Sequence, residues 1–206
     1  FYPGSGAASN NRSVTYNYMD STPERPVWTT SSLARTTWTP EGVYGKPYAT
    51  QYKTAVAPTA PEVNGVTNGA SYFWQHEIGT DEVFASGTTN AITASIESGD
   101  YDISQQPQRE GLGFRGDGEF MMRVSRFLPD FLTQAGNTTV TLNLRNFPND
   151  SAASSTLGPF TITSSTQYQS CRARGRAVAV KIANTAVDSN WKLGTFRLDV
   201  HAGGRR

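Results

Sequence analysis

Residues 138–145, Thr-Thr-Val-Thr-Leu-Asn-Leu-Arg, decide the fold class because apolar and polar side chains alternate along them. Val140, Leu142 and Leu144 are spaced by two, and the residues between them are polar. Successive side chains of a β-strand point to opposite faces, so this spacing places the three apolar residues on one face. The stretch therefore predicts a strand that buries one face and exposes the other.

Similar alternation occurs elsewhere in the second half of the chain. It is found at 91–98, 120–127 and 196–200, with Gly, Pro, Asn or Asp residues between the segments. A further strand is expected to begin at residue 160, after a loop at 149–159. No run has the 3.6-residue spacing of an amphipathic helix. We therefore predict an all-β, mostly antiparallel fold.

The composition agrees with a turn-rich β protein. Ser, Thr and Asn together account for 56 of the 206 residues, and charged residues make up only 17%. Thr, Tyr and Trp favour strands, whereas Ser, Asn, Gly and Pro favour turns. No apolar run approaches the roughly 18 residues of a membrane-spanning helix, so no membrane anchor is expected.

Cysteine usage and the first residues bear on the origin of the chain. Cys171 is the only cysteine, which excludes an internal disulfide and a cysteine-based metal cluster. Secreted domains of this size more often carry paired cysteines, so assembly in the cytoplasm is favoured. The sequence opens with Phe-Tyr-Pro-Gly and shows neither an initiator Met nor a signal peptide, so we expect it to be part of a longer chain.

Two regions are expected along the chain. Residues 1–70 are predicted to be an extended lead-in, rich in Pro and Gly, with short strands, and 71–206 to be a β domain. The stretch 55–70, AVAPTAPEVNGVTNGA, has no periodicity and is interpreted as a connector. Residues 104–119 are polar and Gly-rich, which predicts a loop within the second region.

Charge is segregated although the net charge is only +1. Residues 1–170 hold ten basic and fifteen acidic residues, or −5, whereas residues 171–206 hold eight basic and two acidic residues, or +6. An acidic body with a basic end favours head-to-tail contacts between subunits, or a basic end that faces a polyanion. The alternative is a solvated surface strand.

Three arginines spaced by two form the most distinctive basic feature. Arg172, Arg174 and Arg176 would lie on one face of a strand at intervals of about 6.6–6.8 Å. Val178, Val180 and Ile182 have the same parity as these arginines, although one face cannot belong to both solvent and core. Either Gly175 carries a β-bulge that shifts the register, or the strand leaves the core there. The row would face carboxylates of a neighbouring subunit or phosphates of a duplex.

Catalytic and metal-binding patterns are weak. His76 and His201 are the only histidines, and no Gly-x-Ser-x-Gly elbow is present. The acidic turns at 100–102 and 117–119 do not match a calcium-binding loop. Nothing selects a glycosidase-type pair from the candidate acids Glu77, Asp81, Glu97, Asp100 and Glu119. We therefore expect no enzymatic activity, no metal and no cofactor.

Four phrases resemble the C-terminal part of tail-tube proteins of short-tailed bacteriophages, the nozzle, hub or head-closing stabilisation class. They are IESGDYDI at 96–103, EFMMRVSRFLPDF at 119–131, RARGR at 172–176, and WKLGTFRLDV at 191–200 with a closing Gly-Arg-Arg. Their order and spacing match as well, and the resemblance covers roughly 71–206. The chain departs from the pattern at His201-Ala202-Gly203, where that family would carry more charge.

The resemblance implies a structural virion protein without catalysis. Such proteins form a homo-oligomeric, sixfold ring below the portal and adaptor proteins, with β-propeller- or sandwich-like domains around a channel. Double-stranded DNA would pass through without specific binding, and fibre or needle proteins would dock on the ring. The chain would be found in the phage tail, after assembly in the host cytoplasm.

The resemblance also implies that the arginines lie either in a subunit interface or in the lining of the channel. The candidate residues are Arg172, Arg174, Arg176, Arg197, Arg205 and Arg206. The interface is preferred, because the apolar residues at 178–182 indicate a half-buried strand. The alternative function is a tail-associated fibre or adhesin module that binds or depolymerises polysaccharide. Tyr72, Trp74 and Trp191 would then grip sugars, although their positions in strands favour burial.

Overall fold

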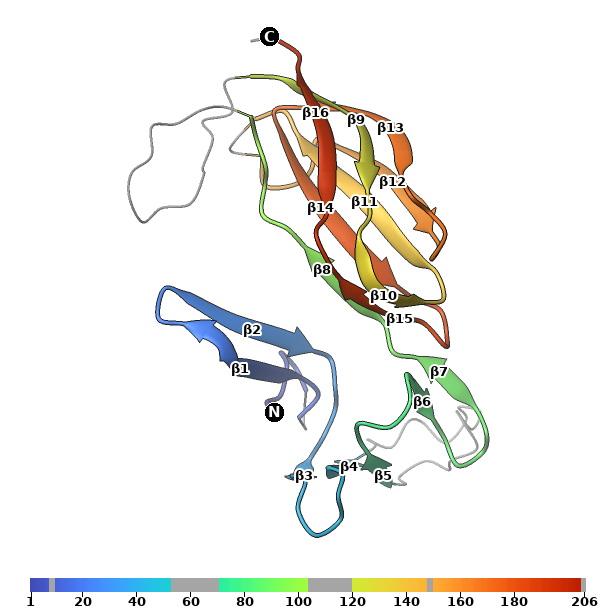
Figure 1. Ribbon diagram of the computed structural model, residues 1–206. Coiled ribbons are helices and arrows are strands. Elements are labelled where there is room, and N and C mark those ends of the chain that lie inside the picture. The colour runs from blue at the N-terminus through green and yellow to red at the C-terminus, as the bar shows by residue number, and fades with distance from the viewer. Residues whose placement is uncertain (8–9, 53–70, 104–119, 148–149, 205–206) are drawn as a thin grey trace, which may run out of the picture. The chain divides into compact units, whose positions relative to one another are not determined.

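The computed structural model describes residues 1–7, 10–52, 71–103, 120–147 and 150–204 (Figure 1). Within these residues the protein has sixteen strands and no helix, and all the ladders between strands are antiparallel. The prediction of an all-β, antiparallel fold is therefore confirmed. A helix of the length and apolarity needed to cross a membrane is not found in this part of the chain.

The described chain divides into two compact units. The first comprises Phe1–Gly79 and Phe84–Thr88, and the second comprises Thr80–Val83 and Thr89–Arg206. The strands of the first unit are β1 (Ser13–Thr22), β2 (Arg25–Ser31), β3 (Thr37–Thr39), β4 (Tyr48–Tyr52) and β5 (Ser71–Gln75). The strands of the second are β6 (Asp81–Val83), β7 (Thr89–Ala91), β8 (Ala94–Glu97), β9 (Met122–Leu128), β10 (Phe131–Ala135), β11 (Thr138–Arg145), β12 (Ser155–Ile162), β13 (Gln169–Gly175), β14 (Ala177–Asn184), β15 (Asn190–Leu193) and β16 (Arg197–Ala202).

The division differs from the expected boundary between residues 70 and 71. Strand β5 pairs with β4 and completes the sheet β3-β4-β5 of the first unit, whereas the sequence placed Ser71–Gln75 with the second region. Composition changes near residue 70, but backbone pairing decides which sheet a strand joins. The expected connector at 55–70 and the expected loop at 104–119 lie outside the described residues.

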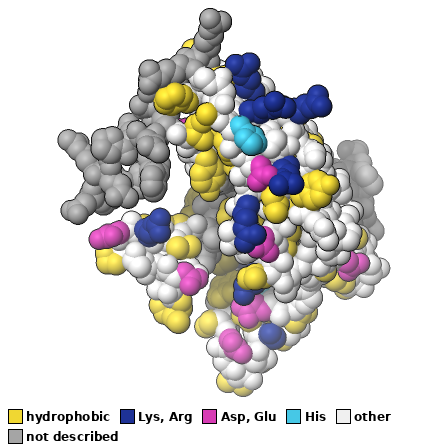
Figure 2. Space-filling view, turned by 45° about the horizontal axis from the view of Figure 1, so that its top comes forward, with side chains coloured by type: hydrophobic (Ala, Val, Ile, Leu, Met, Phe, Trp, Pro, Cys, Tyr) yellow, Lys and Arg dark blue, Asp and Glu magenta, His cyan; other side chains and the backbone are white. Residues whose placement is uncertain are grey.

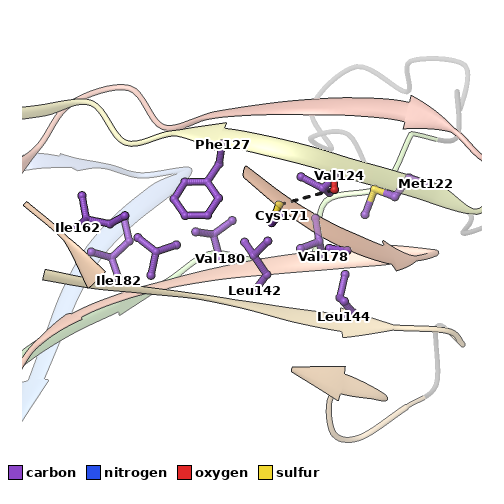
Figure 3. Close-up of a cluster of buried hydrophobic side chains, with 12 residues drawn as sticks. Met122, Val124, Phe127, Leu142, Leu144, Ile162, Cys171, Val178, Val180 and Ile182 are labelled. Carbon is purple, nitrogen blue, oxygen red and sulfur yellow. Dashed lines mark hydrogen bonds between the residues drawn. The ribbon is translucent and has the colours of Figure 1, made fainter. Parts of the chain in front are cut away.

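The second unit is a β-sandwich. Four strands in the order β12-β11-β14-β8 form one sheet, and three strands in the order β13-β9-β16 form the other. Their inner faces enclose the core (Figure 3). The ring of Phe127 packs against the rings of Phe160 and Phe196. The buried residues of this core are Met122, Val124, Phe127, Val140, Leu142, Leu144, Ile162, Cys171, Ala173, Val178, Val180 and Ile182.

Strand β11 behaves as its alternation predicts. Val140, Leu142 and Leu144 are buried, and the residues between them are partly exposed. The neighbouring β12 begins at Ser155, earlier than expected, and continues through Gly158 to Ile162. Its register shifts against β11 between Val140 and Leu142. Gly and Pro in this stretch predicted a loop, but pairing with β11 keeps the chain extended.

The long segment 172–182 consists of two strands that belong to different sheets. It changes sheet at Arg176, whose backbone N–H donates to the carbonyl of Arg145 at 2.8 Å. In a sandwich the two sheets face each other, so passing from one to the other reverses which parity points inward. Arg172 and Arg174 are therefore exposed, while Val178 and Val180, of the same parity, are buried.

Candidate functional site

The exposed face of the sheet β13-β9-β16 carries five of the seven arginines that the structure describes in the second unit. Strand β13 buries Cys171 and Ala173 and exposes Arg172 and Arg174. Strand β9 buries Met122, Val124 and Phe127, and it exposes arginines at 123 and 126. Strand β16 adds exposed Arg197 and His201. Figure 2 shows Lys and Arg side chains gathered near a histidine on one side of the molecule.

Three basic side chains form a row across this face. Arg174 on β13 is paired with Arg123 on β9, and Arg123 is paired on its other side with His201 on β16. Directly opposed residues place their Cβ atoms about 4.5–5.5 Å apart. We call the group formed by Arg123, Arg172, Arg174 and His201 the basic cluster.

Carboxylates are scarce around the basic cluster. Arg126 forms an ion pair with Asp199, and Arg197 Nη2 lies 3.8 Å from Asp130 Oδ2. Within the described part of the chain, no carboxylate lies within ion-pair distance of Arg123, Arg172 or Arg174. As far as the described residues go, these three guanidinium groups therefore keep hydrogen-bonding capacity for a further anionic group.

The basic cluster surrounds an open cavity of about 590 Å³. The remaining lining residues, Ala173, Ala202 and Gly203, are small. The floor is held in place by backbone hydrogen bonds, in which Gly203 N–H donates to the Met121 carbonyl and Met121 N–H donates to the Gly204 carbonyl, each at 2.7 Å. Four basic side chains thus converge on a hollow that small residues leave accessible.

The structure brings together only part of the predicted arginine set. Arg172 and Arg174 belong to the basic cluster, and Arg197 lies on the same face beside Asp130. Arg176 lies at the crossover between the two sheets, and residues 205–206 lie outside the described residues. The apolar residues on which the preference for a subunit interface rested are on β14, in the opposite sheet.

Sequence reasoning did not select Arg123 and His201. The alternation of Met122, Arg123 and Val124 was a usable signal, because it places Arg123 on the exposed face of its strand. Which strands lie on either side of β9 could not be read from the chain. Pairing between β9 and β13, and between β9 and β16, joins residues that are 51 and 78 positions apart in sequence.

His76 has a structural environment in the first unit. It accepts a hydrogen bond at Nε2 from Arg35 Nε at 3.0 Å, and its ring packs on Trp38 with a centroid distance of 4.5 Å. Arg35 is itself buried and also donates to Gln51 Oε1 at 3.0 Å. Burial, together with the positive charge of Arg35, lowers the pKa of His76 below 6.5, and Glu77 opposes the effect. The neutral ring therefore serves as an acceptor for a buried guanidinium.

Three of the five candidate acids are engaged in contacts within the fold. Asp100 pairs with Arg145 at 2.9 Å, Glu97 accepts from Asn143 Nδ2 at 2.8 Å, and Asp81 accepts from the Asp188 N–H at 2.7 Å. Among the residues that the structure describes, no three His, Cys, Asp or Glu side chains form a group that could hold a metal ion. The acidic turn at 117–119 lies outside those residues.

The three aromatic residues considered for sugar binding are half-buried. Trp74 donates from its indole N–H to Gln51 Oε1 at 3.0 Å, and Tyr72 packs against the Trp74 ring. Trp191 donates to Asn184 Oδ1 at 3.0 Å. Their polar atoms and ring faces are thus used in part within the fold.

A second cavity, of about 440 Å³, lies within the sandwich between β14 and β16. Its walls are largely side chains of the core, including Val178, Val180, Leu198 and Val200. Glu97 and Asp102 also line it, but no basic residue is among its described lining residues. A comparison of the chain with protein-family models and with curated protein sequences finds no match.

Proposed function

We propose that the chain is a structural subunit of the tail tube of a short-tailed bacteriophage, of the nozzle or hub type. Copies of the subunit assemble into a ring, sixfold as in the proteins it resembles, that closes the head and extends the DNA channel. Portal or adaptor proteins lie on one side, and fibre or needle proteins dock on the ring. The role is geometric rather than catalytic.

The observation that carries this proposal is the hairpin formed by β1 and β2. Every residue of β2 is exposed, and no further described strand pairs with either member of the hairpin. Tyr16 and Trp28 lie opposite each other with ring centroids 4.6 Å apart, yet 46% and 58% of their surfaces are exposed. An isolated two-stranded hairpin is at best marginally stable in water, so a neighbouring subunit that covers these rings supports its fold.

Charge segregation supports a ring as the form of assembly. Residues 1–170 carry −5, and residues 171–206 carry +6, or +4 without Arg172 and Arg174 of the basic cluster, so a head-to-tail contact between these parts brings unlike charges together. Heterologous contacts of this kind close into rings when the rotation between copies divides a full turn. The all-β fold and the four phrases at 96–103, 119–131, 172–176 and 191–200 are in agreement with the proposed class.

The test is the native mass of the protein by light scattering or mass photometry, over a range of protein and salt concentrations. A sixfold or twelvefold mass supports the proposal. A trimer contradicts it and favours the fibre or adhesin alternative, with polysaccharide cleavage as the next assay. A monomer whose mass does not change with concentration contradicts it as well.

A pair of variants links assembly to the hairpin. Tyr16→Thr combined with Trp28→Thr is expected to shift the mass toward the monomer, because it removes the apolar surface that the neighbour covers. Tyr44→Thr is the matched control, since Tyr44 is an exposed aromatic residue of the same unit outside the hairpin. Equal assembly of both variants would assign the contact to another surface.

A further inference from the structure

We propose that the basic cluster on the sheet β13-β9-β16 binds phosphate groups of the backbone of double-stranded DNA, without reading the base sequence. The inference deepens the proposed function and rests on it for DNA as the source of the phosphates. The observation that carries it is the convergence of Arg123, Arg172, Arg174 and His201 on one open cavity.

The geometry of the basic cluster suits an extended anion. Arg172 and Arg174 are two positions apart on one strand, which separates them by about 6.6–6.8 Å. Arg123 lies across from Arg174 on the next strand, and His201 follows on the third. Donors are therefore spread in two directions over the sheet, so more than one phosphate can be contacted at a time. Each guanidinium can donate two parallel hydrogen bonds to one phosphate.

The charge balance of the cluster calls for an anion. Like charges directly opposite on neighbouring strands are unfavourable, and Arg174 and Arg123 are such a pair. Asp199, the carboxylate on this face of β16, is engaged with Arg126 rather than with the cluster. A bound phosphate would place negative charge between the guanidinium groups and remove their repulsion.

The surroundings of the cluster favour nucleic acid over a protein partner. In the described residues, none of the exposed large hydrophobic side chains belongs to β9, β13 or β16, and exposed Tyr168, which directly precedes β13, lies under Arg126 rather than beside the cluster. The cores of protein–protein interfaces are apolar and enriched in aromatic residues, whereas protein–DNA interfaces are more polar and strongly basic. Ser125, whose Oγ lies 3.5 Å from His201 Nε2, adds a hydroxyl of the kind that contacts phosphates.

The shape of the site limits it to the DNA backbone. The major groove admits a helix or a two-stranded ribbon. The cluster instead lies around a hollow on a three-stranded sheet that is backed by a second sheet. Contacts with base edges in the major groove are therefore not expected at this surface, and binding is expected to be independent of sequence and sensitive to salt.

The experiment measures binding of the full chain to two fluorescent duplexes of equal length and unrelated sequence, by anisotropy over a series of salt concentrations. Three arginines that each contact one phosphate give a slope of about −2.7 in a plot of log K against log salt, since each contact contributes about −0.9. Each of Arg123→Gln, Arg172→Gln and Arg174→Gln should make the slope shallower by about 0.9. The corresponding Arg→Lys variants should retain most of the salt dependence of the unaltered protein.

Lys181→Gln is the matched control. Lys181 is an exposed cation on β14, in the opposite sheet, and its loss should leave the slope unchanged. An equal effect of Lys181→Gln and Arg174→Gln would overturn the proposal, because it would show diffuse attraction. Different affinities for the two duplexes would overturn it as well.

A competition experiment distinguishes phosphate from carboxylate as the group that the cluster binds. Poly-L-glutamate that displaces the duplex at an equal or lower concentration of charge would overturn the proposal and assign the cluster to an acidic protein surface. Native mass is measured on the same samples. Rings that do not bind DNA would refute this inference and leave the proposed function standing, whereas DNA binding by a chain that never forms rings would refute the proposed function alone.

Discussion

Arg174 of β13 lies directly opposite Arg123 of β9, so two guanidinium-bearing residues share one cross-strand position. The adjacent pair in the same ladder is Ala173 with Val124, and both of these residues are buried. The register that packs Ala173 against Val124 in the core therefore sets Arg174 against Arg123 outside. Packing of the buried face fixes a juxtaposition that the charged face by itself would oppose.

This relationship predicts that Arg174→Gln stabilises the free protein at low salt. Removing one of two opposed like charges should raise the free energy of unfolding by about 0.2–1 kcal/mol. The gain should shrink as salt screens the pair. Urea unfolding at two salt concentrations measures it. Lys181→Gln should have the opposite sign, because Lys181 lies opposite Glu97. Destabilisation by Arg174→Gln at low salt would contradict the repulsion argued here.

A matched pair of leucines tests the assignment of the core. Leu142 on β11 is fully buried, whereas Leu132 on β10 is 64% exposed. Leu142→Ala should lower the free energy of unfolding by about 2–5 kcal/mol, because it removes apolar contacts and leaves a cavity. Leu132→Ala should change it by less than about 0.5 kcal/mol. Similar losses in both variants would contradict the sandwich core described here.

Cys171 provides a probe of the second unit. Its side chain is buried against β9, where the thiol donates to the Val124 carbonyl at 3.6 Å (Figure 3). Burial raises the pKa of this thiol, so little of the reactive thiolate is present at neutral pH. A thiol reagent such as DTNB should therefore react slowly with the native protein and rapidly in urea. Fast reaction without denaturant would contradict the buried position.

His76 should make the stability of the first unit depend on pH. Its lowered pKa means that the folded unit favours the neutral ring, which accepts the hydrogen bond from Arg35. The stabilisation that neutral His76 gives the folded unit is complete above its usual pKa of 6.5. It is lost as the pH falls through the lowered pKa. Thermal unfolding across this range, followed by tryptophan fluorescence, measures it. His76→Gln should flatten the profile, because an amide oxygen accepts the bond without titrating.

Two glycines test the backbone of the sandwich. Gly158 has a φ of 112°, and a Cβ built there would lie 2.8 Å from the Val140 carbonyl oxygen. Gly158→Ala should therefore destabilise the second unit by more than about 1 kcal/mol, through strain and the close approach of β11. Gly99→Ala has open space around it and should change stability little. Comparable effects in urea unfolding would show that β12 does not approach β11 as described.

The local sequence was sufficient to predict strands β9 and β11, each of which buries one face. The alternation of Val140, Leu142 and Leu144 predicted β11, and the alternation from residue 120 onward predicted β9, because a two-residue period leaves one interpretation. It was insufficient at β12, where Gly and Pro predicted a loop. It was also insufficient at β5, since its own residues do not reveal that its partner is β4.

The candidate site shows the same limit. Arg172 and Arg174 were recognised as neighbours because their spacing is local. Arg176 was grouped with them, although the chain changes sheet there. Arg123 and His201 complete the basic cluster through pairings that join distant parts of the chain. Nothing in the sequence around Arg123 or His201 reveals that the two residues lie in one row with Arg174.

The sequence by itself determined the fold class, the segregation of charge along the chain and the strand face that Arg172 and Arg174 share, because these follow from composition and a two-residue period. Only the tertiary structure decided which strands are neighbours. That choice depends on how the inner faces of two sheets fill a common core. It made one face of β13-β9-β16 basic, and it placed Arg123 between Arg174 and His201.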